Sequence, residues 1–153
     1  LFLFRVGDGT RQANRTRARP ESVAMATIAP DVPSAYQDLK IGRKHRFIVF
    51  TIDNLVVKAQ KIGDRNKNWE DLVATIPGSN CRYIVYDYEY KTSDGRQASK
   101  LYLIFWKPLN SNDQDKVLYA QTMPKFMDLL TGVVKATASE EEEIEELLSS
   151  ESR

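Results

Sequence analysis

The sequence predicts an α/β protein of the α+β type, with a central mixed β-sheet of five to six strands flanked by helices on both faces. Three observations lead to this prediction. Strand-like segments occur in two adjacent pairs separated by turn residues, within 45–59 and 81–106, which is typical of β-hairpins. Helix-like segments lie before, between and after these pairs. Each helix carries one apolar face, which has to be buried against a sheet.

A short helix and a hairpin open the predicted domain. Asp31 is suited to cap the helix and Gly42 to stop it. The run 45–52 contains enough consecutive apolar residues for a buried strand. The turn signal at 53–54 pairs this strand with a second one over 55–59.

A second helix and hairpin follow in the middle of the chain. A polar loop over 63–68 precedes a helix over 69–76, which Asn68 caps. Strands over 81–91 and 100–106 then form the second predicted hairpin, because turn residues lie between them.

The C-terminal part holds the longest predicted helix, over 113–131. Pro124 lies inside it and is expected to kink it. A short edge strand is predicted over 133–137. The final helix begins with a capping box formed by Ser139 and Glu142.

Length and composition exclude several classes of protein. The 153 residues fit one domain, and no run reaches the roughly 18 apolar residues that a membrane-spanning helix needs. Cys81 is the only cysteine, so an intrachain disulfide and a cysteine-based metal cluster are excluded. The net charge is +1, whereas nucleic-acid binders usually carry a stronger basic face. We therefore expect no nucleic-acid partner.

The charge is distributed unevenly along the chain. Five arginines against two acidic residues give residues 1–24 a charge of +3, and sixteen basic against twelve acidic residues give 25–138 a charge of +4. One arginine against seven glutamates gives 139–153 a charge of −6. We interpret 1–24 as an upstream leader or an artificial extension, expected to be disordered, and 25–153 as the domain. A transit peptide and a basic binding arm are the alternatives for 1–24.

The sequence offers little support for catalysis. His45 is the only histidine, which argues against a metal site or a nucleophilic triad. Asp87 and Glu89 lie on one face of a predicted strand, as an acid–base pair can, but a solvated or Lys/Arg-paired strand face is the favoured interpretation. The glycines form no phosphate-binding loop. We therefore expect a protein that is not an enzyme and uses no cofactor or metal.

The most informative segment is a strand that ends in Trp106, followed by Pro108 and a helix with Lys116 beside Val117. This arrangement presents a mixed basic and apolar helix face, which suits a protein partner better than a small substrate. The alternative is that Val117 belongs to the core and Lys116 is only a solvated helix end.

Several segments of 25–153 resemble the actin-depolymerising factor (ADF)/cofilin family in order and spacing. These segments are Tyr36–Gly42 with Lys44–Phe50, Asn80–Tyr90, Phe105–Pro108 and Lys116–Ala120. The resemblance implies an ADF-homology, gelsolin-like fold and a monomeric, non-enzymatic protein at the cytoplasmic actin cytoskeleton. It also implies binding to actin monomers, preferably with ADP, and to filaments, and it implies that filament disassembly is promoted.

The resemblance assigns roles to individual residues. The residues implied in monomer binding are Lys116, Val117, Gln114, Gln121, Thr122, Thr27 and Ile28. The residues implied in filament binding are Arg96, Lys100, Glu142 and Glu145. Thr27 also stands at the family's inhibitory phosphorylation site, and an unmodified linker residue is the alternative.

The chain departs from the family pattern at both surfaces. Gln114 replaces a lysine and Val117 replaces a methionine, so the long helix is less basic and phosphoinositide binding should be weak. Ala98 replaces a basic residue, and glutamates dominate the last helix. We therefore expect monomer binding to be kept and filament binding and severing to be weakened.

Two other functions compete with this interpretation. Gln114 and the Asp94–Arg96 turn favour a protein similar to glia maturation factor, which binds the actin-branching complex and promotes debranching. A phosphoinositide or lipid-surface module is the further alternative, and it requires residues 1–24 to be functional.

Overall fold

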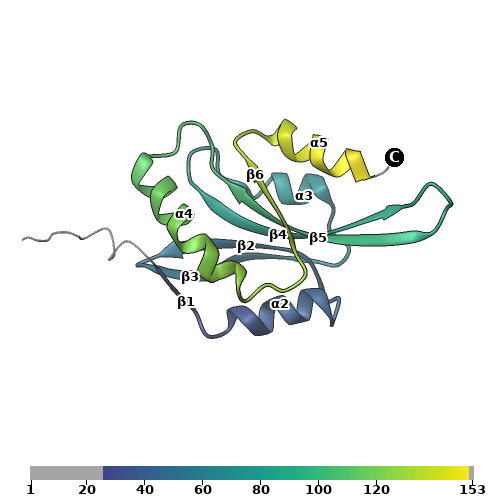
Figure 1. Ribbon diagram of the computed structural model, residues 1–153, viewed down its shortest axis with the longest axis horizontal. Coiled ribbons are helices and arrows are strands. Elements are labelled where there is room, and N and C mark those ends of the chain that lie inside the picture. The colour runs from purple at the N-terminus through teal and green to yellow at the C-terminus, as the bar shows by residue number, and fades with distance from the viewer. Residues whose placement is uncertain (1–25, 152–153) are drawn as a thin grey trace, which may run out of the picture.

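The computed structural model describes residues 26–151, so the segment 1–24 assigned to a leader lies outside the described residues. Figure 1 shows a curved sheet with helices on both of its faces. In chain order the elements are β1 (Thr27–Ile28), α2 (Val32–Lys40), β2 (His45–Asp53), β3 (Val56–Asp64), α3 (Trp69–Val73), β4 (Arg82–Lys91), β5 (Gln97–Trp106), α4 (Asp113–Met127), β6 (Val134–Ala138) and α5 (Glu141–Glu151).

The sheet has six strands in the order β1-β3-β2-β4-β5-β6. The four inner strands pair antiparallel. The two edge strands pair in parallel, β1 with β3 and β6 with β5. The predicted mixed sheet and fold class are therefore confirmed. The two-residue strand β1 was not predicted.

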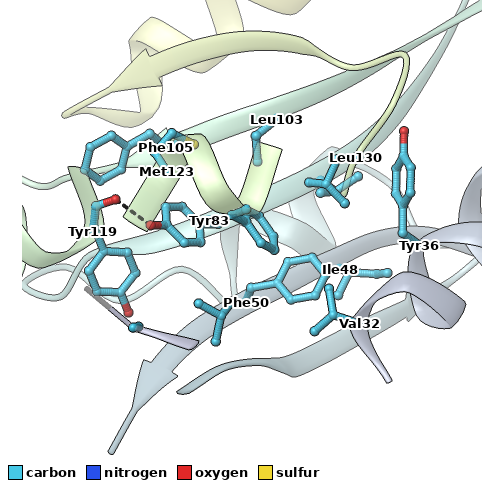
Figure 2. Packing of buried hydrophobic residues seen from close by; sticks show 14 of the residues in the cluster. Val32, Tyr36, Ile48, Phe50, Tyr83, Leu103, Phe105, Tyr119, Met123 and Leu130 are labelled. Atoms are coloured by element: carbon cyan, nitrogen blue, oxygen red, sulfur yellow. Dashed lines mark hydrogen bonds between the residues drawn. The ribbon is translucent and has the colours of Figure 1, made fainter. Parts of the chain in front are cut away.

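Each face of the sheet carries its own hydrophobic core. Residues from α2 and α4 pack on one face, and residues from α3 and α5 pack on the other. The α4 side is rich in aromatic contacts (Figure 2): the ring of Tyr83 stacks on Phe126 at 4.7 Å, and Phe50 meets Phe126 edge-on at 5.0 Å. These contacts fix α4 against the centre of the sheet.

The prediction of a polar loop over 63–68 is partly wrong, because β3 continues to Asp64. Backbone pairing with β2 extends the strand through residues that lack an apolar pattern. Gly63 is buried in this extension, and a Cβ atom there would overlap the ring of Phe47. A glycine inside a strand marks such a close approach.

The helix ends follow the predictions only in part. Asn68 caps α3 in a capping box, accepting a hydrogen bond from the Asp71 amide at 3.0 Å. The side chain of Asp31 does not cap α2. At the start of α5, Glu143 takes the role expected of Glu142, since its Oε1 accepts hydrogen bonds from the backbone amides of both Ser139 and Glu140.

The long helix α4 is shorter than predicted. It runs through Pro124 and ends at Met127, one turn before the predicted end. Asn112 begins it by accepting a hydrogen bond from the Asp115 amide at 2.7 Å. Gly132 lies beyond the helix with a φ of 88°, the left-handed conformation that glycine adopts without strain.

Candidate functional site

The turn between β5 and α4 sets where the long helix begins. The indole of buried Trp106 donates a hydrogen bond to the carbonyl of Pro77 at 2.8 Å. The hydroxyl of Ser111 donates to the carbonyl of Pro108 at 2.6 Å. The first bond ties the end of β5 to the segment after α3, and the second closes the turn on itself, so the first residues of α4 have a fixed position.

The inner face of α4 is fixed by Tyr119. Its hydroxyl accepts a hydrogen bond from the Ile52 amide at 2.9 Å, and its carbonyl accepts one from the Tyr83 hydroxyl at 2.5 Å (Figure 2). Burial raises the pKa of Tyr83 far above its ordinary value, so this hydroxyl stays protonated and can donate. The helix therefore cannot rotate without breaking these two hydrogen bonds.

The outer face of α4 is defined here by Gln114, Lys116, Val117 and Gln121. Val117 is 50% exposed, so the interpretation that it belongs to the core is wrong. The Lys116 ammonium donates to the carbonyl of Leu109 at 3.3 Å, and Leu109 is itself 70% exposed. The start of α4 thus presents a half-buried lysine near the exposed aliphatic side chains of Leu109 and Val117.

Thr122 does not belong to this outer face. Its side chain is fully buried, and its Oγ1 accepts a hydrogen bond from the backbone amide of Ala26 at 3.1 Å. The expectation that Thr122 contacts a partner directly is corrected, because a buried hydroxyl cannot reach one. Thr122 instead attaches the N-terminal strand to the long helix.

The strand β1 places Thr27 and Ile28 at the edge of the sheet. The Thr27 amide donates to the carbonyl of Leu55 at 2.9 Å, and its hydroxyl approaches the same oxygen at 3.3 Å. Thr27 is exposed, whereas Ile28 is half-buried and packs on the α4-side core. Through Ala26 and Thr122, β1 and α4 form one continuous structural unit.

The four residues expected to bind filaments lie in the β4–β5 hairpin and on α5. Arg96 belongs to the β4–β5 turn, where its guanidinium donates to the carboxylate of Asp94 at 3.0 Å. Lys100 is half-buried on β5 and pairs opposite Tyr88. Glu142 and Glu145 are exposed on α5. The structure therefore gives Arg96 a carboxylate partner, which reduces its free positive charge.

A cluster of five charged residues on β2, β4 and the adjoining loops was not predicted as a unit. Asp87 is buried, and Arg65 donates to it at 2.7 Å. Glu89 accepts from Arg43 and Arg65 at 2.6 Å each and lies 2.9 Å from Arg46. The fold brings these arginines to the two carboxylates from separate segments of the chain, so no local sequence pattern could have predicted the cluster.

This cluster explains the carboxylate pair that the sequence left open. Burial acts to raise the pKa of Glu89, but the hydrogen bonds and charges of Arg46 and Arg65 outweigh it, so the pKa lies below its usual value. Burial acts to lower the pKa of Arg65, but its hydrogen bonds to Asp87 and Glu89 outweigh burial, so the pKa lies above its usual value. A general acid or base needs a pKa near neutrality, and Glu89 is shifted away from it. The Arg-paired interpretation is the one that the geometry supports.

Within residues 26–151, no group of three or more His, Cys, Asp or Glu side chains is arranged to hold a metal ion. In the same range no helix is long and apolar enough to cross a membrane.

Comparison with known proteins tests the resemblance. The model of the cofilin/tropomyosin-type actin-binding protein family matches residues 25–151. Actin-depolymerizing factor 6 of Arabidopsis thaliana is 30% identical over 138 residues, which cover 87% of this chain and 94% of that protein. Actin-depolymerizing factor 9 of Oryza sativa subsp. japonica is 37% identical over 100 residues, which cover 64% of this chain and 72% of that protein.

Solved structures share the same fold. Cofilin from Streptomyces griseoflavus superposes with a TM-score of 0.73 at 25% identity, covering 81% of this chain and 93% of that one. Actin depolymerization factor 2 of Plasmodium berghei gives a TM-score of 0.73 at 21% identity, covering 82% and 95%. The family match extends over the whole described sheet and its helices, including the long helix α4. The chain belongs to the ADF/cofilin family and forms an ADF-homology domain of the actin-binding type.

Proposed function

We propose that this protein binds monomeric actin, preferably in the ADP-bound form, through the outer face of α4 and the strand β1, and so promotes filament depolymerisation. The observation that carries the proposal is the position of Lys116 and Val117. Val117 is exposed and Lys116 is half-buried beside it, on a helix whose inner side is fixed by two hydrogen bonds to Tyr119. A rigid helix with a basic and apolar face is suited to a hydrophobic groove on a protein partner.

The proposed activity requires no chemical step. A protein that binds one state of an assembly more tightly shifts the equilibrium toward that state. Preferential binding to ADP-actin monomers would therefore favour subunit loss from filaments. No cofactor or metal enters this mechanism, and the chain acts as a binding protein and not as an enzyme.

The test compares Lys116→Ala with Lys61→Ala in the full chain. Lys61 is exposed on β3 and lines a hollow with residues of α3, on the sheet face opposite α4. The two variants remove the same charge from different faces. We expect Lys116→Ala to weaken binding to fluorescently labelled ADP-actin monomers about tenfold or more, as for a central interface residue. We expect Lys61→Ala to bind like the unaltered protein.

Equal binding by all three proteins would reject the α4 site. If the unaltered chain binds neither monomers nor filaments, the actin proposal fails, and binding to the actin-branching complex becomes the next measurement. The replacement of lysine by Gln114 and the ordered Asp94–Arg96 turn favour that second function. Binding to phosphoinositide vesicles would be measured in parallel for the lipid-surface alternative.

We also propose that filament binding and severing are weak. Arg96 is paired with Asp94, and α5 presents Glu142 and Glu145 to solvent. Like charges lower the association rate with an acidic filament surface. Co-sedimentation with filaments should show weaker binding than monomer assays do. Efficient severing at low stoichiometry under filament imaging would contradict this proposal.

Thr27 is the proposed site of inhibitory phosphorylation. Its side chain is exposed on β1, and a phosphate would add a charge of about −1.5 to −2 at the proposed contact. We expect Thr27→Glu to weaken monomer binding and Thr27→Ala to leave it near normal. Equal binding by the two variants would leave Thr27 an ordinary linker residue.

A further inference from the structure

A second hollow lies on the opposite side of the sheet from α4. It is an open groove of about 510 Å³ between α3 and α5, two helices that cover the same face (Figure 1). Its volume is within the roughly 300–1,000 Å³ range of ligand pockets. Nothing in the proposed actin contact through α4 uses this groove.

The groove has an apolar, partly aromatic wall. Trp69 and Val73 of α3, Tyr88 of β4 and Leu148 of α5 line it. Trp69 is one end of an aromatic row: its ring lies edge-on to Tyr86 with centroids 6.1 Å apart, and Tyr86 continues to Tyr88 at 6.3 Å. Tyr88 in turn stacks on Tyr90 at 5.7 Å. The row holds the two groove-lining rings in fixed positions, and an aromatic wall of this kind attracts cations.

The rim of the same groove is acidic. Glu70 of α3 and Glu141 and Glu145 of α5 line it, and all three are exposed. Among the described residues none of these three carboxylates forms an ion pair, and no lysine or arginine lines the groove. Lys100 pairs opposite Tyr88 in the ladder but is not part of the lining. The groove therefore combines a net negative rim with an apolar aromatic wall.

From these features we infer that the groove between α3 and α5 binds an arginine side chain, flanked by aliphatic residues, from a segment of a partner protein. A planar guanidinium stacks on aromatic rings and donates to two carboxylates at once, which a compact ammonium does less well. The aliphatic neighbours of that arginine would lie against Val73 and Leu148. The inference is independent of the proposed monomer contact, since it uses neither α4 nor β1, although Glu145 also belongs to the proposed filament surface.

The experiment follows Trp69 in the full chain by NMR during titration with the peptide acetyl-Ser-Leu-Arg-Leu-Ser-amide. The indole N–H of Trp106 is an internal reference, because that side chain is buried and bonded to Pro77. A second peptide with citrulline in place of arginine has nearly the same shape without the charge. The signals of α5 amides are followed in the same spectra.

Two double variants with the same charge change separate the groove from the general charge of α5. Glu141→Gln with Glu145→Gln removes two groove carboxylates, and Glu142→Gln with Glu146→Gln removes two exposed carboxylates of α5 that do not line this groove. We expect saturable shifts of Trp69 with the arginine peptide and none with the citrulline peptide. We expect the groove variant to raise the dissociation constant at least tenfold and the control variant to change it less than twofold.

Three results would overturn the inference. The first is a Trp69 signal that does not move at millimolar arginine peptide. The second is an equal loss of affinity in the two double variants, which would assign the effect to net charge. The third is a Trp69 signal that shifts with protein concentration in the absence of peptide, which would assign the groove to a second copy of this chain. Each measurement is made without actin, so failure of the actin proposal leaves the outcome unaffected.

Discussion

The hydrogen bond between Thr122 and Ala26 makes the attachment of β1 experimentally accessible. Thr122→Val keeps the branched shape of the side chain but removes the oxygen that accepts from the Ala26 amide at 3.1 Å. Both residues are fully buried, so water cannot replace that oxygen while β1 stays in place. The neighbouring Tyr83 hydroxyl keeps its acceptor on the Tyr119 carbonyl. The change should therefore act mainly on β1.

The magnitude follows from the cost of one unsatisfied buried amide, about 1–3 kcal/mol. Only two ladder pairs hold β1 to β3, Thr27 with Val56 and Ile28 with Val57. So short a strand can open without unfolding the rest of the sheet. Since 1.4 kcal/mol is a factor of ten, the open form of β1 should become roughly 5 to 150 times more populated.

Native-state hydrogen exchange measures this population directly. The Thr27 and Ala29 amides donate to the carbonyls of Leu55 and Val57, both at 2.9 Å, and their exchange should accelerate by that factor. Amides of the central strand β4 should change much less. Thr122→Ser is the matched control, because it restores the acceptor while losing a methyl group worth about 0.8 kcal/mol. It should lower global stability and leave the protection of β1 relative to β4 unchanged.

The reasoning fails if Thr122→Val leaves the exchange of Thr27 and Ala29 within twofold of the unaltered protein. It also fails if all amides accelerate together, because β1 would then open only with the whole domain. If the prediction holds, the same variant should weaken actin-monomer binding, since the proposed contact includes residues of β1.

Three further changes test the packing, the helix cap and the charged cluster. Gly63→Ala should lower the free energy of unfolding in urea by about 1–3 kcal/mol, because its Cβ would overlap the buried ring of Phe47. Gly78→Ala is the control and should be nearly neutral, because no atom lies within 4 Å of its Cβ. Equal effects of the two changes would contradict the packing argument. Asn68→Ala should cost about 1 kcal/mol in the same assay through loss of the α3 cap, and an unchanged unfolding midpoint would refute that role. The pKa of Glu89 is lowered in the folded state, so its stabilisation is present above the unfolded carboxyl pKa of about 4.3 and is lost as pH falls through the folded value. Glu89→Gln should therefore destabilise at neutral pH, and its difference from the unaltered protein should shrink below about pH 4; a difference independent of pH would exclude this linkage.

Local patterns were sufficient to predict most elements of this fold. The apolar run 45–52 and the turn after it produce a strand and a hairpin in the structure. Asn68 caps α3 as predicted, since a cap involves only residues three positions apart. The prediction failed by one residue at α5, where Glu143 forms the bonds expected of Glu142. Consecutive glutamates are equally able to accept hydrogen bonds from the first backbone amides of the helix. Which one does so depends on the residue at which the helix begins, here Glu141.

Elements that depend on distant partners could not be predicted in the same way. The strand β1 has two residues and exists because Val56 and Val57 present a free edge to it. β3 extends to Asp64 through pairing with β2, although its last residues have the composition of a loop. In both cases backbone pairing outweighs the local preference, since strand formation depends strongly on context.

The candidate site shows the same division between local and distant information. The sequence predicted a mixed basic and apolar helix face, but it left Val117 between core and surface and placed Thr122 at the surface. Both questions depend on the rotation of α4 about its axis. Hydrogen bonds to Tyr119 from Ile52 on β2 and Tyr83 on β4 fix that rotation. With Tyr119 inward, the helical repeat of 3.6 residues brings Thr122 inward as well and leaves Val117 outward. One buried tyrosine therefore determines which side chains of the long helix are available to a partner.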